Sequence, residues 1–138
     1  MSLAFPLLSV VFTGISALIA FLVPIVLAVL CCRRSRNALL SISVGAVCFL
    51  AGAMLLESLF HQLVFSLVPG IAQNLVLYCL YGGLAAGLFE ETARLIGLRF
   101  LCKKQESSAV TRFPNAVGHG GIEAIMLPGI TMLTNQKD

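Results

Sequence analysis

Two adjacent glutamates and an arginine interrupt the apolar stretch Gly82–Phe100, which reads GGLAAGLFEETARLIGLRF. These residues are Glu90, Glu91 and Arg94. A lipid bilayer accepts ionised groups only where other protein groups or trapped water solvate them, so they are candidates for a functional site. At helical spacing they share one face with four small residues, which are Gly83, Ala86, Gly87 and Gly97. We therefore expect the carboxylates to point into a helix bundle, and the pair Gly83-x-x-x-Gly87 to admit a neighbouring helix.

A second polar cluster follows in the segment Gly118-His119-Gly120-Gly121-Ile122-Glu123. His119 and Glu123 are four residues apart and so lie on one face of a helix. Arg99 ends the first apolar stretch and Arg112 begins the second, which predicts similar membrane depths for the two clusters. Because the connection between the two helices is short, we expect them to pack as antiparallel neighbours.

If the helices pack in this way, Glu90, Glu91, His119 and Glu123 meet in one pocket. Carboxylates and imidazole are ligands for a divalent metal such as Zn²⁺, and a carboxylate beside a bound water is a general base. We assign His119, Glu123 and Glu91 as candidate metal ligands, and Glu90, Glu91 and Arg94 as candidate catalytic residues. Arg94 would keep a carboxylate ionised or steady a substrate oxyanion. The glycines beside His119 would let a substrate backbone approach.

A simpler interpretation also accounts for part of this pattern. Arg94 lies four residues after Glu90 and three after Glu91, which are the spacings of an intrahelical ion pair that only neutralises charge. Glu57 and His61 form another pair four residues apart, which we expect near the outer face of the membrane. If the second apolar segment enters the membrane more deeply, His61 becomes a candidate second imidazole ligand.

The composition indicates an integral membrane protein. Of 138 residues, 59% are hydrophobic and 11% are charged, whereas a soluble domain carries about a quarter charged residues. The sequence predicts an all-α, polytopic membrane protein with four transmembrane helices in an antiparallel bundle, forming a single domain over residues 1–138. The predicted spans are about 3–30, 38–56, 75–98 and 116–133.

Positive charge predicts the orientation of these spans in the cell membrane. The loops 31–37 and 99–115 are basic, whereas residues 57–74 contain no lysine or arginine. By the positive-inside rule both basic loops are cytoplasmic and both termini lie outside. The basic loops are too short for more than topology and contact with anionic lipid headgroups, so we expect lipid but no nucleic acid as a partner. The five cysteines show no metal or disulfide spacing. The sequence is also compatible with a homo-oligomer.

The two polar segments together resemble a known family. Glu90-Glu91-Thr92-Ala93-Arg94 resembles the Glu-Glu-x-x-(Arg/Lys) motif of the PrsW and CAAX-protease superfamily. Followed by Gly118-His119-Gly120-Gly121-Ile122-Glu123, it resembles more closely the YhfC family of intramembrane metalloproteases. This resemblance implies hydrolysis of a membrane-associated peptide in or near the bilayer. Glu90 or Glu91 would activate the attacking water, and His119 would belong to the metal or water site.

The resemblance also implies a further polar motif on a later helix, because family members are larger. We therefore expect this chain to be a C-terminally truncated member, either inactive as given or completed by a partner chain. Two other function classes remain open. A small proton-coupled transporter would use a buried glutamate to alternate between proton and cation binding. A non-catalytic membrane scaffold would bind no metal and would tolerate Glu91→Gln.

Overall fold

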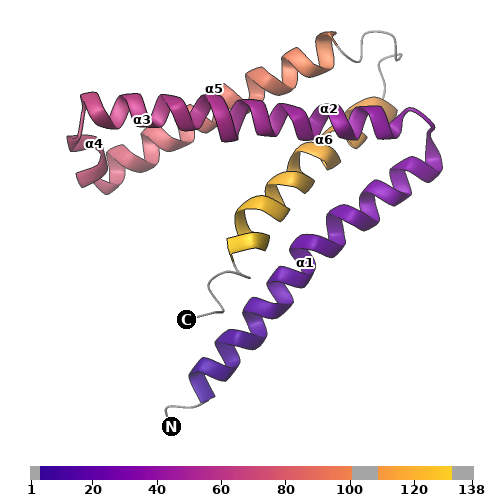
Figure 1. Ribbon diagram of the computed structural model, residues 1–138, viewed down its shortest axis with the longest axis horizontal. Coiled ribbons are helices and arrows are strands. Elements are labelled where there is room, and N and C mark those ends of the chain that lie inside the picture. The colour runs from indigo at the N-terminus through magenta and orange to yellow at the C-terminus, as the bar shows by residue number, and fades with distance from the viewer. Residues whose placement is uncertain (1–3, 101–108, 132–138) are drawn as a thin grey trace. The chain divides into compact units, whose positions relative to one another are not determined.

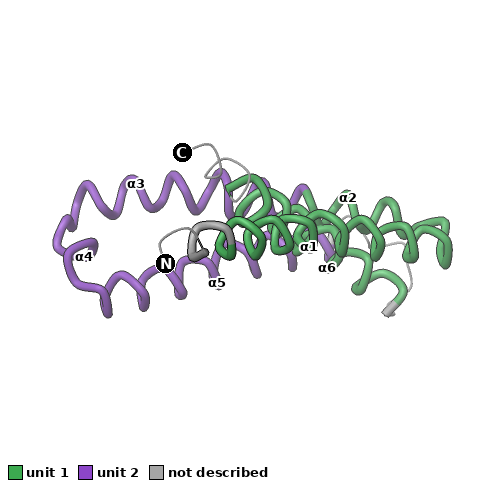
Figure 2. The backbone as a smooth tube through the Cα atoms, turned by 90° about the horizontal axis from the view of Figure 1, so that it is seen from below, with its two compact units in different colours: residues 1–46, 107–138 green, residues 47–106 purple. Residues whose placement is uncertain are grey.

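The computed structural model describes residues 4–100 and 109–131, and all the elements in these ranges are helical. Figure 1 shows them in chain order: α1 (Ala4–Arg34), α2 (Ala38–Phe49), the π-helix η1 (Leu50–Glu57), α3 (Ser58–Leu67), α4 (Gly70–Gln73), α5 (Leu75–Phe100), α6 (Ala109–Ala124) and the π-helix η2 (Ile125–Gly129). The chain divides into two compact units, residues 1–46 with 107–138, and residues 47–106 (Figure 2). The two units are described separately.

Two continuous helices in the described ranges are long and apolar enough to cross a membrane, Leu8–Arg34 and Ala38–Leu67. The first agrees with the predicted span 3–30 but continues into the basic residues. The predicted span 38–56 lies within the second helix, which runs on through η1 and α3. It stops only before Pro69, whose ring disfavours a helical conformation at Val68. Glu57 and His61 therefore lie in a helix and not in a loop.

The two later predicted spans, 75–98 and 116–133, correspond to the helices α5 and α6 with η2. Neither is among the candidate spans in the described residues, because charged and polar side chains lower their hydropathy. The helix α6 begins at Ala109, so Arg112 lies inside a helix and not in the predicted loop 99–115. Residues 101–108, with Lys103 and Lys104, and residues 132–133 lie outside the described ranges. The number of membrane spans and their orientation stay predictions.

The first unit is built on very close contacts between α6 and the helices α1 and α2. Cys31, Ala38 and Val117 form its buried centre, and three partly buried apolar residues pack against them, Leu27, Ala28 and Ile42. A Cβ atom added at Gly118 would overlap the carbonyl group of Ile42, and one added at Gly45 would overlap the Asn115 carbonyl. Glycine is required at both positions because the backbones of α2 and α6 nearly touch.

The second unit is a helical hairpin in which η1 and α3 pack against α5. Gly52 in η1 makes the closest approach: a Cβ there would lie 2.8 Å from the Ala93 Cβ and 3.0 Å from the Phe89 carbonyl oxygen. In the described residues no atom lies within 4 Å of a Cβ built at Gly83 or Gly87, so the prediction that these glycines admit a neighbouring helix stays a prediction. The helix α5 has small residues on more than one side. The side that contains Ala93 packs against η1, because Gly52 of η1 allows the close approach there.

Candidate metal centre

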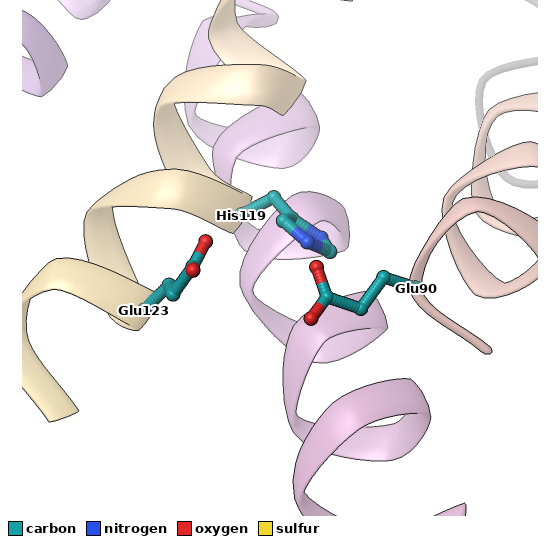
Figure 3. Close-up of side chains that lie close together, drawn as sticks. All are labelled: Glu90, His119 and Glu123. Carbon is teal, nitrogen blue, oxygen red and sulfur yellow. The ribbon is translucent and has the colours of Figure 1, made fainter. Parts of the chain in front are cut away.

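His119 and Glu123 come from one helix, α6, as their spacing predicts. Figure 3 shows both side chains projecting from the same side of this helix. His119 is 6% exposed, and Glu123 is half-buried. An imidazole and a carboxylate one turn apart on a helix are a common pair of ligands for a divalent metal.

Asn115 fixes the helix that carries His119. Its side chain is fully buried one turn before His119, and its Nδ2 donates a hydrogen bond to the carbonyl oxygen of Ser41 on α2, at 3.2 Å. The Ser41 side chain is also fully buried. A buried amide that bridges two helices holds their relative rotation, because breaking the bond would leave a polar group without a partner. Sequence reasoning missed Asn115, for which an amide inside an apolar helix was the available signal.

The glycines beside His119 serve helix packing more than substrate access. Gly118 faces the Ile42 carbonyl, and a Cβ at Gly121 would lie 3.0 Å from the Pro24 Cβ. Gly120 alone of these three has no atom within 4 Å of its Cβ position among the described residues. The Gly-His-Gly-Gly sequence therefore places His119 tightly against α1 and α2, and the predicted approach of a substrate at these glycines stays a prediction.

The two adjacent glutamates of α5 lie in different environments. Arg94 Nη2 forms an ion pair with a carboxylate oxygen of Glu91 at 2.5 Å, and the Glu91 side chain is 56% exposed. Glu90 is half-buried. The intrahelical ion pair considered from the sequence is thus present, three residues apart and through Glu91. Arg94 balances the charge of Glu91, so the two neighbouring carboxylates differ in both exposure and electrostatic partner.

A further polar cluster lies in the hairpin of the second unit, which also contains Glu90 and Glu91. His61 Nε2 contacts Glu57 Oε1 at 3.1 Å, and His61 Nδ1 contacts the Tyr81 hydroxyl oxygen at 2.7 Å. Glu57 is 8% exposed. The spacing of Glu57 and His61 predicted their contact, but Tyr81 on α5 was missed. Both ring nitrogens of His61 are engaged here, which argues against its use as a second imidazole ligand.

Replacing Tyr81 by phenylalanine should destabilise this hairpin. The change removes the hydroxyl group and leaves the part-buried His61 Nδ1 without its Tyr81 partner, which should cost on the order of 1 kcal/mol. Tyr78, the other tyrosine, stacks on Phe65 and is exposed, so Tyr78→Phe is the matched control. Thermal unfolding in detergent measures both variants. Equal melting temperatures would contradict a stabilising role for the Tyr81–His61 bond.

Comparison with known proteins identifies the family. The model of the family described as YhfC intramembrane metalloprotease matches residues 4–136. The chain belongs to this family. The YhfC match includes both α5 and α6, and therefore all five residues that the sequence singled out for the site. Membership also establishes the chain as a membrane protein, in agreement with its composition.

A relative from Bacillus subtilis (strain 168), named as the uncharacterized membrane protein YhfC, is 36% identical over 129 residues. The alignment covers 91% of this chain and 50% of the relative, so the chain spans about half the length of that protein. No solved structure matches this chain significantly.

Proposed function

We propose that this chain carries the metal-binding part of an intramembrane protease that hydrolyses peptide bonds of a membrane-associated substrate. The observation that carries the proposal is the pair His119 and Glu123. A buried imidazole and a half-buried carboxylate share one side of a helix in a membrane protein of the YhfC family. Ionisable groups inside membrane helices raise the free energy of the folded protein in the bilayer, so such groups generally mark functional sites.

We propose His119 and Glu123, together with Glu90 on the basis of its position in the sequence, as the three ligands of a divalent metal, preferably zinc. The donor set fits this use, because a catalytic zinc takes three nitrogen or oxygen ligands from the protein and keeps one position open. Arg99 and Arg112 give a common reference for depth. At 1.5 Å per residue along each helix, Glu90 lies about 13 Å from Arg99 and His119 about 10 Å from Arg112. Two membrane helices with basic ends on the same side would bring these donors to similar depths.

Glu91 is the proposed general base. The sequence left Glu91 as ligand or base, and its ion pair with Arg94 favours the second role, because the guanidinium orients the carboxylate and occupies oxygen atoms that a metal ligand would need. A bound divalent metal would polarise the scissile carbonyl and lower the pKa of water. Glu91 would accept the proton of the attacking water and pass it to the amine that leaves.

Metal content is the test of this proposal. We expect the detergent-purified chain to contain one divalent metal per chain, and His119→Ala to lose it. The chain has two histidines, so His61→Ala is the matched control and should keep the metal. Glu90→Gln and Glu123→Gln should each reduce the metal content as well. Metal that is absent from the wild-type chain, or equally present in the His119→Ala variant, would refute this ligand set.

A further inference from the structure

A cavity of about 350 Å³ lies in the first unit, between the last turn of α1 and the first turns of α6. Its wall is mainly apolar, with Leu30 from α1 and with Val110, Phe113 and Pro114 from α6. The polar lining comes from Arg34 and Ser35 at the end of α1. A cavity of this size with one cationic group is large enough for part of an amphiphilic molecule.

The charge around this cavity is positive. Arg34 has no carboxylate within ion-pair distance in the described residues. Three further arginines of the same unit lie within a few residues of the lining and are exposed: Arg33, Arg36 and Arg112. The acidic residue of the described part of this unit is Glu123, which follows Pro114 along α6 by about 13 Å at helical rise. A cationic site without a local counter-charge attracts an anion.

We propose that this cavity binds an anionic phospholipid, with the phosphodiester at Arg34 and the glycerol and upper acyl chain along the apolar wall. Two observations favour a lipid over a free anion. The cavity lies where the apolar helix Leu8–Arg34 ends in two arginines, which is the position of headgroups at a membrane surface. Most of its lining is apolar and would gain nothing from contact with a free phosphate ion.

Native mass spectrometry of the detergent-purified chain measures this binding with phosphatidylglycerol as the probe. We expect phosphatidylglycerol to bind more tightly than phosphatidylcholine. Arg34→Gln should weaken its binding on the order of fivefold, the effect of one basic residue at an anionic membrane surface. Arg36→Gln, in the same basic segment but outside the lining, is the matched control with the same loss of charge. Inorganic phosphate and glycerol phosphate should not compete with the lipid.

Three results would overturn the proposal. Equal weakening by Arg34→Gln and Arg36→Gln would show a diffuse surface charge and no site. Competition by inorganic phosphate as strong as that by the lipid would show an anion site without lipid selectivity. If Arg34→Gln does not fold, Val110→Trp fills the apolar part of the cavity and keeps every arginine. Unchanged phosphatidylglycerol binding by this second variant would also contradict binding in the cavity. Metal content is independent of all three results, so the proposed protease function is tested separately.

Discussion

Substituting Glu91 with glutamine is expected to slow cleavage of a membrane-embedded peptide by two to four orders of magnitude, while the metal stays bound. The size follows from the usual contribution of a positioned general base, about 10²–10⁴ in rate. Glutamine keeps the shape of the side chain but cannot take a proton from water. The metal should remain because the proposed ligands are Glu90, His119 and Glu123, and because Arg94 already engages Glu91.

Two further variants make this experiment specific. Glu90→Gln should lose both cleavage and metal, which separates a ligand from a base at neighbouring positions. Thr92→Ala changes the next residue, which is exposed, and should leave both properties unchanged. The assay is release of a fluorescent fragment from a transmembrane peptide in vesicles that contain the chain, with metal content measured on the same preparations.

The outcomes distinguish the function classes that the sequence leaves open. Loss of metal in Glu91→Gln would make Glu91 a ligand, as one assignment from the sequence has it. Unchanged cleavage in that variant would refute Glu91 as the base. Bound metal without any cleavage by the wild-type chain would refute hydrolysis by this chain alone. Cation uptake driven by a pH difference, with no cleavage, would favour a transporter.

The second large effect is expected from Gly118→Ala, which should strongly lower the stability of the first unit. Gly→Ala inside a helix normally stabilises by about 1 kcal/mol. At Gly118 the added Cβ would overlap the carbonyl group of Ile42. Backbone atoms of a neighbouring helix cannot rotate away as a side chain can, so α6 must shift. Overpacking of this kind costs about 1–3 kcal/mol or more.

Gly120→Ala is the matched control, because Gly120 lies in the same helix with no atom within 4 Å of its Cβ position among the described residues. This variant should be neutral or slightly stabilised. The melting temperature in detergent measures the difference between the two variants. Because Gly118 precedes His119, a shifted α6 should also weaken metal binding in Gly118→Ala. Equal melting temperatures for the two variants would contradict the close contact of α2 with α6.

The class of protein and the positions of most helices were predictable from the sequence. A long apolar segment predicts a membrane helix without knowledge of the tertiary structure, because hydropathy is summed over consecutive residues. The placement of His119 and Glu123 on one side of α6 was also predictable, because a spacing of four residues has a defined direction within a single helix. The ion pair of Glu91 with Arg94 follows from the same local geometry.

Features that depend on a distant partner were decided only by the tertiary structure. The second helix continues to Leu67, past the polar residues Glu57 and His61. His61 contacts Glu57 in its own helix and Tyr81 of α5, which is 20 residues further along the chain. Asn115 bonds to the Ser41 carbonyl, 74 residues earlier, and this contact orients the helix of His119. Gly52 decides which side of α5 is packed. In each case the role of a side chain, or of a glycine without one, depends on which atoms of the neighbouring helix lie opposite it. The local sequence pattern does not specify these atoms.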